Sequence, residues 1–170
     1  MENSDIVIER LNWKRAPIFL KLKRKLENET NNLVISSGER KETLLHVWLR
    51  MLAHRGRAHI YIANINFEPV GYISVILPRF KKFRGNVYIP TVLVSSKCRG
   101  IGVGTCLLSQ IEKLAKEKNK RRIELEVFSS NTEAIKLYEK LGFVREGLRR
   151  KAVQLEDSFD DIVFMTKFLD

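Results

Sequence analysis

Cysteine and proline are scarce in this 170-residue chain, which has two cysteines and four prolines. Cys98 and Cys106 have no histidine nearby, so the sequence has neither the ligand spacing of a zinc site nor the disulfide framework of a small secreted domain. No run of eighteen apolar residues occurs, which excludes a membrane-spanning helix. The polar start, Met1 to Asp5, differs from a signal peptide. We therefore expect a cytoplasmic protein that binds no metal.

Acidic residues are also few relative to basic ones, and the formal net charge is +11. Such a charge favours anionic ligands and attracts nucleic acid without sequence specificity. No nucleic-acid motif with interleaved aromatic residues is recognised, so we expect a basic surface that recruits a polyanionic cofactor, with no specific nucleic-acid partner and no membrane partner. The length and the even composition predict one domain over residues 1–170.

Hydrophobic periodicity predicts an alternation of strands and helices. Asn12 is a candidate helix N-cap, and Pro17 is tolerated only in the first turn of the helix that follows. Residues 66–69 have the composition of a hairpin turn. Pro90 lies inside a predicted strand and therefore indicates a bulge or a sheet edge. The expected strands are 5–11, 58–65, 70–77, 87–94, 122–128, 143–147 and 159–168, and the expected helices are 14–28, 39–54, 102–118 and 131–141.

Three glycines at alternate positions, Gly100, Gly102 and Gly104, follow the predicted strand 87–94 and open the predicted helix 102–118. Glycine permits positive φ angles and close approach of a ligand. The free N–H groups of a first helical turn attract anions, and Arg99 adds a positive charge. The run predicts a site for phosphate or pyrophosphate, although a tight connection without a ligand has the same local sequence. It lacks the lysine of a P-loop and the spacing of a dinucleotide fingerprint.

The run Arg99-x-x-Gly102-x-Gly104 resembles the acyl-CoA loop of the GNAT superfamily of N-acetyltransferases. A second run, Asn131-x-x-Ala134-x-x-x-Tyr138-x-x-x-Gly-Phe, resembles another element of that superfamily. The resemblance implies an α/β (α+β) fold with a mixed, mostly antiparallel sheet of about seven strands, flanked by helices and splayed at an acetyl-CoA cleft. It also implies a set of acetyl-CoA-binding residues: Leu93, Val94, Arg99, Gly100, Ile101, Gly102, Val103, Gly104, Thr105, Asn131 and Tyr138.

The same resemblance assigns chemistry to two residues. Tyr138 is expected to protonate the departing CoA thiolate, because a phenol with a pKa near 10 starts protonated and exceeds a thiol near 8.5. Glu126 is the expected base for the amine, and Glu124, on the same strand face, is the reserve. The alternatives are a structural aromatic residue at Tyr138 and a strand carboxylate that pairs with Arg122 or a lysine at Glu126.

The string Leu125-Glu126-Val127, with Asn131 and Tyr138, is most similar to the ribosomal-protein alanine N-acetyltransferases. It implies a protein N-terminal α-amine as acceptor. A polyamine, an amino acid or an antibiotic is the alternative acceptor, and a non-catalytic CoA-binding or RNA-binding protein is the alternative function. The acids near Asp157 either attract a cationic amine or form an exposed turn. The chain is expected to be a monomer or a homodimer.

Overall fold

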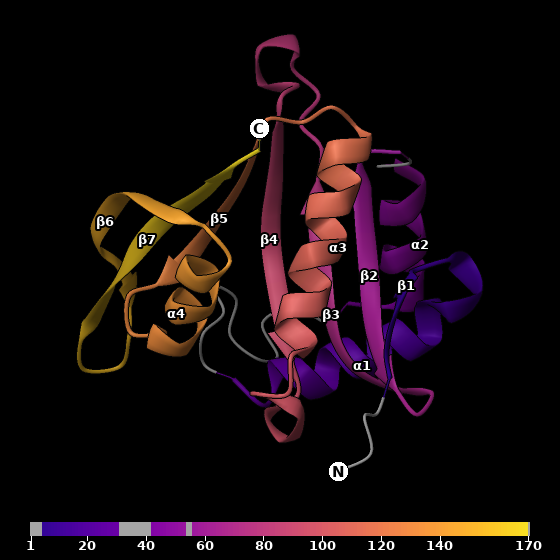
Figure 1. Cartoon of the computed structure of the whole chain (residues 1–170). Coiled ribbons are helices and arrows are strands. Elements are labelled where there is room, and N and C mark those ends of the chain that lie inside the picture. Colours follow the sequence, from indigo (N-terminus) through magenta and orange to yellow (C-terminus); the bar gives the residue numbers. More distant parts are fainter. Residues whose placement is uncertain (1–4, 31–41, 54–55, 170) are drawn as a thin grey trace.

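The computed structural model describes residues 5–30, 42–53 and 56–169. Its order of strands and helices is the one that the sequence predicts (Figure 1). The helices are α1 (Ala16–Glu27), α2 (Leu44–Ala53), α3 (Val103–Glu117) and α4 (Thr132–Lys140). The strands are β1 (Ile6–Arg10), β2 (Ala58–Ile65), β3 (Glu68–Ile76), β4 (Asn86–Val94), β5 (Arg122–Phe128), β6 (Val144–Gln154) and β7 (Phe159–Phe168). Short 3-10 turns are η1 (Trp13–Arg15), η2 (Lys81–Phe83) and η3 (Ser96–Cys98).

The strands form one seven-stranded sheet in the order β1-β2-β3-β4-β5-β7-β6. Only β4 and β5 pair in parallel, and every other neighbouring pair is antiparallel. The predicted mixed, mostly antiparallel sheet is therefore confirmed. The parallel pair exists because α3 carries the chain from the end of β4 back to the start of β5, as parallel neighbours require.

Local signals at the N-terminal end act as the sequence predicts. The Asn12 side chain accepts a hydrogen bond from the Arg15 amide at 3.1 Å and so caps η1, which leads directly into α1. Pro17 lies in the first turn of α1, where no backbone donor is needed. Asn66 and Phe67 both have positive φ angles and form the tight turn between β2 and β3.

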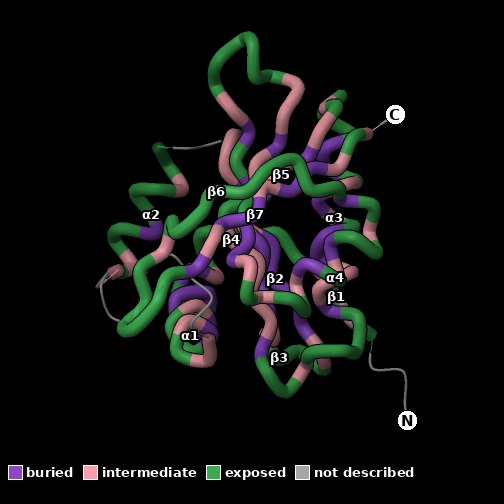
Figure 2. The backbone as a smooth tube through the Cα atoms, turned by 90° about the vertical axis from the view of Figure 1, so that its left-hand side faces the viewer, coloured by how far each residue is buried: buried purple, intermediate pink, exposed green. Residues whose placement is uncertain are grey.

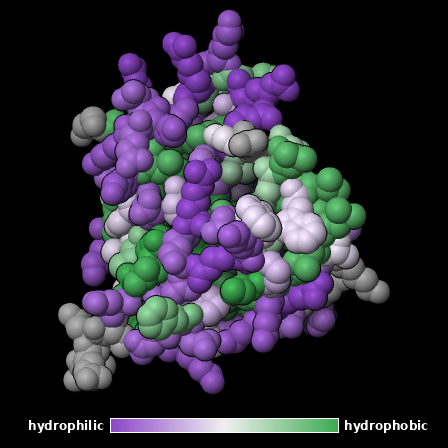
Figure 3. All heavy atoms as spheres, turned by 90° about the vertical axis from the view of Figure 1, so that its right-hand side faces the viewer, coloured by the Kyte–Doolittle hydropathy of each residue, from purple (hydrophilic) through white to green (hydrophobic). Residues whose placement is uncertain are grey.

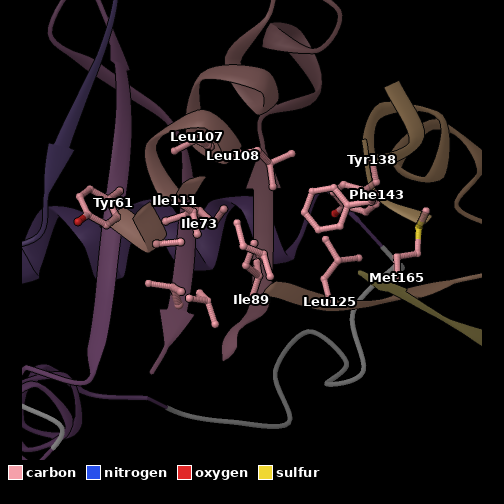
Figure 4. Close-up of a cluster of buried hydrophobic side chains, with 14 of the residues drawn as sticks. Tyr61, Ile73, Ile89, Leu107, Leu108, Ile111, Leu125, Tyr138, Phe143 and Met165 are labelled. Carbon is pink, nitrogen blue, oxygen red and sulfur yellow. The ribbon is translucent and has the colours of Figure 1, made fainter. Parts of the chain in front are cut away.

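The helices cover both faces of the sheet and create two apolar cores. One core lies under α3 and α4, and the close-up shows Tyr138 and Phe143 next to Leu125 and Met165 (Figure 4). The other core lies under α1 and α2 and includes Phe19, whose ring meets Tyr72 edge to face at 5.2 Å. Because strand side chains alternate between faces, the central strands β2, β3 and β4 contribute to both cores.

β4 and β5 pair only over their first halves. Their register runs from Asn86 opposite Arg122 to Ile89 opposite Leu125, and no further pair follows. Pro90 is the next residue of β4 and has no N–H to donate. At the same place the register between β3 and β4 shifts, so that β4 contains one extra residue. The predicted irregularity at Pro90 is confirmed as a bulge.

The bulge exchanges the two faces of β4. Before it, Val87 and Ile89 pack into the core under α3; after it, Val92 and Val94 do. One extra residue shifts the alternation of side chains by one position, as in any register slip. β4 therefore stays apolar toward α3 along its whole length while its second half separates from β5.

Most predicted boundaries lie within two residues of the observed ones, and two differ by more. β6 is eleven residues long, whereas apolar alternation predicted only 143–147. Most of its residues are exposed, and it forms the sheet edge (Figure 2), so its sequence has no buried face that would produce alternation. The predicted helix 39–54 is observed from Leu44 to Ala53, and its other positions at 39–41 and 54 lie outside the described residues. None of the described helices could cross a membrane.

Candidate active site

The glycine run forms a turn between β4 and α3. The chain leaves β4 at Val94, makes the 3-10 turn η3, and enters α3 after Gly102. Gly100 and Gly102 have φ angles of +76° and +96°, in the left-handed region that side chains disfavour. Gly104 is needed for a different reason, since an added Cβ would lie 2.9 Å from Cδ2 of Leu137 on α4. The turn thus combines a special backbone with close packing of α3 on α4.

The start of α3 is built to receive an anion. The helix has no side-chain cap, and its first turn contains no acidic residue. The first helical hydrogen bond runs from the Cys106 amide to the Gly102 oxygen, which leaves the amides of Val103, Gly104 and Thr105 without an intrahelical acceptor. These donors and the helix dipole suit a phosphate or pyrophosphate, and exposed Arg99 lies at the entrance. The residues present therefore fit the polyanionic arm of CoA.

The carboxylate of Glu29, two residues after the end of α1, binds this turn. Glu29 accepts hydrogen bonds from the Ser96 amide at 2.8 Å and from the hydroxyls of Ser95 and Ser96 at 3.1 and 3.2 Å. The Ser96 amide is the main reason that the pKa of Glu29 is lowered. The ionised carboxylate therefore fixes the point where the chain leaves β4.

Tyr138 lies on α4, in the core under α3 and α4. Its side chain is 8% exposed, and its ring centroid is 5.7 Å from that of Phe143. Burial raises the pKa of Tyr138 to about 12, since the phenolate would lose its hydration. The phenol is therefore protonated throughout the physiological range and packs beside Leu125, the last β5 residue that pairs with β4 (Figure 4).

The turn between β5 and α4 is held by a buried aspartate. Asn131 caps α4, its side-chain oxygen accepting from the Ala134 amide at 3.3 Å. Just before it, the hydroxyls of Ser129 and Ser130 each donate to Asp160 of β7 at 2.6 Å. Burial opposes ionisation of Asp160, but the two hydroxyls and its backbone donors outweigh it, and the pKa is lowered. Asp160 is thus occupied within the fold and is not available to attract a substrate amine.

Glu126 lies on the opposite side of the sheet from Tyr138. Ile123, Leu125 and Val127 of β5 face the core that contains Tyr138, so the alternate positions Glu124 and Glu126 face away from it. Glu126 is the first β5 residue beyond the last pair with β4. Its nearest cation is Arg149 at 3.8 Å, a loose and half-exposed ion pair.

Glu124, the reserve candidate, is more firmly held. Its carboxylate lies 2.6 Å from Nε of Arg122 and accepts a hydrogen bond from the Asn86 side chain at 2.8 Å. The pairing with Arg122 that the sequence analysis considered for Glu126 is therefore made by Glu124. Glu124 would have to give up both of these contacts before it could act on a substrate amine.

The second half of β4 does not pair with β5, and we call the place where these two strands separate the split. The main-chain groups of this half of β4 border the split. The Ser95 amide donates to the Val70 oxygen of β3 at 2.8 Å. Because successive residues of a strand direct their main-chain groups to opposite sides, Val94 points toward β5, Leu93 toward β3, and Val92 again toward β5. The split therefore displays the main chain of Val94, as predicted, together with that of Val92, which the sequence analysis did not single out.

A cavity of about 1220 Å³ lies between α1, α2 and the sheet, on the face opposite Tyr138, and we call it the α2 cavity. It extends to Pro90 and Thr91, where β4 begins to separate from β5. Lys23, Glu27, Glu42 and Arg50 pair with one another along its wall. Its other arginines, which form no ion pair with a described carboxylate, are Arg10, Arg57 and Arg79.

Apolar side chains gather beside this cavity. Leu45, Leu49 and Leu52 of α2 are between 53% and 69% exposed. Figure 3 looks at the molecule from the side of α2 and β1 and shows apolar atoms collected along one flank, with hydrophilic atoms and smaller apolar groups over the rest of that face. The cavity is therefore bordered by apolar surface and carries an excess of positive charge among its described residues.

Comparison with known proteins identifies the family. The sequence model of the acetyltransferase (GNAT) family matches residues 24–143. The chain belongs to the GNAT family. It is an acetyl-CoA-dependent N-acetyltransferase, and acetyl-CoA is its co-substrate.

Two curated GNAT relatives act on different acceptors by name. The L-amino acid N-acetyltransferase AaaT of Escherichia coli (strain K12) is 30% identical over 123 residues, which are 72% of this chain and 75% of that protein. N-alpha-acetyltransferase 30 of Xenopus laevis is 35% identical over 97 residues, 57% of this chain and only 36% of that protein.

Two solved GNAT structures match almost the whole chain. The acetyltransferase yncA of Salmonella typhimurium, solved with acetyl-CoA, has a TM-score of 0.83 at 21% identity and covers 98% of this chain and 95% of its own. Ribosomal-protein-alanine N-acetyltransferase of Brucella melitensis has a TM-score of 0.79 at 25% identity, covering 96% and 99%. The first likeness shows the fold alone.

Sequence reasoning did not single out three residues of this candidate site: Val92, Glu29 and Asp160. Val92 lies in the predicted strand 87–94, but the direction of its main-chain groups depends on how the strands pair. Glu29 lies in a polar segment with no motif, and no local signal could have found it. Asp160 was noticed only as one of several acids near Asp157. Within the described residues no cluster of histidine, cysteine or acidic side chains could hold a metal, and both cysteines are free.

We expect Gly102→Val to abolish measurable acetyl-CoA binding. Valine is disfavoured at a φ of +96°, and its branches would project beside the amides that receive the pyrophosphate. Isothermal titration calorimetry with acetyl-CoA provides the measurement. Gly85→Ala is the matched control, because an added Cβ meets no atom within 4 Å there. Unchanged affinity in a folded Gly102→Val variant would rule out this turn as the binding loop.

We expect Asp160→Asn to lower the free energy of unfolding at pH 7 by about 1–3 kcal/mol, because two serine hydroxyls lose a charged acceptor. The lowered pKa means that the contribution is complete above the unfolded value near 3.9 and disappears as pH falls through the folded value. Urea unfolding at pH 7 and pH 3.5 should therefore show a smaller acid-induced loss in the variant than in wild type. Asp157→Asn, in the exposed turn, is the control; equal loss in all three proteins would contradict the assignment.

Proposed function

We propose that this N-acetyltransferase transfers the acetyl group to an α-amine at the N-terminus of a protein. Two relatives are named for such an activity: N-alpha-acetyltransferase 30 matches 57% of this chain, and ribosomal-protein-alanine N-acetyltransferase covers 96% of it. The alternative relative acts on L-amino acids, which also present an α-amine. An α-amine, with a pKa near 7.7–8.0, loses its proton far more readily than lysine near 10.4, so it requires only modest base assistance.

The observation that carries the proposal is the position of Glu126 and Tyr138 on opposite faces of the sheet, at the point where β4 and β5 separate. In acetyl transfer by direct attack, an amine bonds to the thioester carbon from one side and the thiolate leaves on another. A base is needed where the amine arrives and an acid where the sulfur departs. The split provides one such group on each face.

Glu126 is assigned as the base because it is exposed and only loosely paired. Its carboxylate can accept a proton from an incoming ammonium group, directly or through water, without breaking a strong ion pair. Glu124 would first have to leave Arg122 and Asn86. The half-exposed position of Glu126 also gives a macromolecular substrate access to it.

Tyr138 is assigned as the acid because burial keeps it protonated. With a pKa of about 12 it holds its proton more tightly than a thiol near 8.5 in the resting enzyme. A thiolate released into the same apolar core is also poorly hydrated, so its affinity for a proton rises, and the proton transfer moves the negative charge from the sulfur to the Tyr138 oxygen. Tyr138 then regains a proton from solvent.

Binding of the co-substrate is assigned mainly to backbone groups. The amides of Val103, Gly104 and Thr105 receive the pyrophosphate with help from Arg99. The main-chain groups of Val92 and Val94 receive the amides of the pantetheine arm, and an N–H from this segment stabilises the developing oxyanion. The role predicted for Leu93 passes to Val92 in this proposal.

A free amino acid is the second candidate acceptor, and one observation favours it. The α2 cavity contains three arginines, Arg10, Arg57 and Arg79, without carboxylate partners among the described residues. Their charges would attract the α-carboxylate that a free amino acid carries and an internal peptide position lacks.

We expect Tyr138→Phe to reduce kcat by about 10²- to 10⁴-fold with little change in the affinity for acetyl-CoA, since only the proton donor is removed. Steady-state kinetics and calorimetry on the same preparation measure the two quantities. Phe143→Leu serves as a packing control that leaves the phenol in place. A kcat equal to that of wild type would exclude Tyr138 as the acid.

The acceptor is identified by CoA-thiol release from acetyl-CoA with four amines. These are peptides with a free α-amine, the same peptides acetylated at the N-terminus but containing lysine, free L-amino acids, and a polyamine. We expect release with the first only, and its loss in Glu126→Gln at fixed acetyl-CoA affinity. Thiol release with free amino acids alone would support the second candidate acceptor. Absence of thiol release with all four amines would contradict both candidates.

A further inference from the structure

The loop between β3 and β4 is strongly basic and projects beyond the end of the sheet (Figure 1). Its sequence is Arg79-Phe80-Lys81-Lys82-Phe83-Arg84, four cations and two aromatic residues with no acid. Moreover, no aspartate or glutamate occurs anywhere between Glu68 and Glu112. The positive charge of this loop is therefore not neutralised by neighbours in the sequence.

The two phenylalanines are displayed toward solvent. Phe80 is 73% exposed and Phe83 is 56% exposed. Phe80 caps the start of the 3-10 turn η2 and Phe83 is the last residue of that turn, and the Phe83 amide donates to the Phe80 oxygen at 3.0 Å. Because a 3-10 helix has three residues per turn, positions three apart lie on the same side. The loop thus presents a pair of apolar rings without a covering partner among the described residues.

A second basic turn lies against this loop. Lys118, Lys120 and Arg121 connect α3 to β5, and Nζ of Lys120 donates to the Arg84 oxygen at 2.5 Å. The Arg121 amide donates to the Gly85 oxygen at 2.7 Å. These contacts join the two turns into one surface, which consists of residues 79–84 together with Lys118, Lys120 and Arg121. We call it the basic–aromatic surface.

The basic–aromatic surface is separate from the co-substrate site. The pyrophosphate donors lie at the start of α3, whereas Lys118 and Lys120 follow its end. A helix of 15 residues is about 22 Å long, so the two cationic regions are that far apart. Recruitment of acetyl-CoA therefore does not explain why cations and exposed aromatic rings are combined here.

We propose that the basic–aromatic surface binds single-stranded RNA. Exposed aromatic rings stack on unpaired bases of any sequence, and lysine and arginine around them contact the phosphates. Both components are present on one projecting loop and the turn that supports it. The overall charge of +11 adds long-range attraction for such a polyanion. The interleaved aromatic residues that a nucleic-acid surface requires thus occur at Phe80 and Phe83.

The arrangement favours RNA over an anionic membrane. Lys81 and Lys82 lie between the two phenylalanines in the chain, at the same end of the loop. Insertion of both rings into a bilayer would carry these ammonium groups toward the hydrocarbon, which is costly. A single strand instead places phosphates and bases side by side, so cations and rings can be engaged together.

Fluorescence anisotropy with a labelled oligouridylate tests the proposal. We expect Phe80→Ala/Phe83→Ala to weaken binding by about 10-fold or more, because base stacking is lost while every charge remains. Lys81→Ala/Lys82→Ala should reduce the slope of log affinity against log salt concentration by about 1.4, since each phosphate contact contributes about 0.7. Lys136→Ala/Lys140→Ala on α4 removes the same charge elsewhere and is the matched control.

Two further measurements distinguish single-stranded RNA from duplex RNA and from a membrane as the partner. A duplex RNA of equal charge should bind wild type more weakly than the single strand, because its bases are already stacked. Equal affinity for both, or an unaffected phenylalanine variant, would overturn the proposal. Co-sedimentation with phosphatidylserine vesicles that is lost in the phenylalanine variant, with RNA binding unchanged, would overturn it in favour of a membrane. CoA-thiol release should remain at the wild-type rate in all these variants, so the result is independent of the acceptor assignment.

Discussion

The interruption of the hydrogen-bond ladder between β4 and β5 is the constraint on which this structure depends. A proline at position 90 cannot donate to a neighbouring strand, and the bulge around it moves the second half of β4 away from β5. Main-chain groups beyond that point need other partners, since unpaired buried amides and carbonyls are costly. A co-substrate with amides along its length can supply them. The separation of β4 from β5 therefore results from a missing backbone donor and a bulge, and it does not require small side chains at this place.

Both turns beside the opening are fixed by carboxylates from elsewhere in the chain. Glu29 binds the turn that follows β4, and Asp160 binds the turn that follows β5. Each carboxylate is ionised and accepts at least one hydroxyl and one amide, so each holds several donors in one geometry. The starts of α3 and α4 are thereby positioned relative to the split. Preorganised donors of this kind require no rearrangement when charge develops.

The two sides of the split differ in chemical character. On the side of α3 and α4 the split is bordered by backbone groups, glycines and a buried phenol. On the side of α1 and α2 the cavity walls are built from charged and apolar side chains, including three arginines without a carboxylate partner among the described residues. Side chains diverge more freely than a glycine turn, because they alter specificity without altering the fold. The curated relatives carry different activity names, L-amino acid N-acetyltransferase and N-alpha-acetyltransferase.

Local sequence determined the order of elements, the bulge at Pro90, the glycine turn before α3 and the faces of α4, because periodicity and glycine spacing act over a few residues. Tertiary structure alone decided which carboxylate is free: Glu124 is engaged by Arg122 and Asn86, whereas Glu126 is only loosely paired. It also decided the direction of the main chain at Val92, the internal role of Asp160 and the full length of β6. Each of these depends on pairing between strands that are distant in the chain, and no short-range pattern records that pairing.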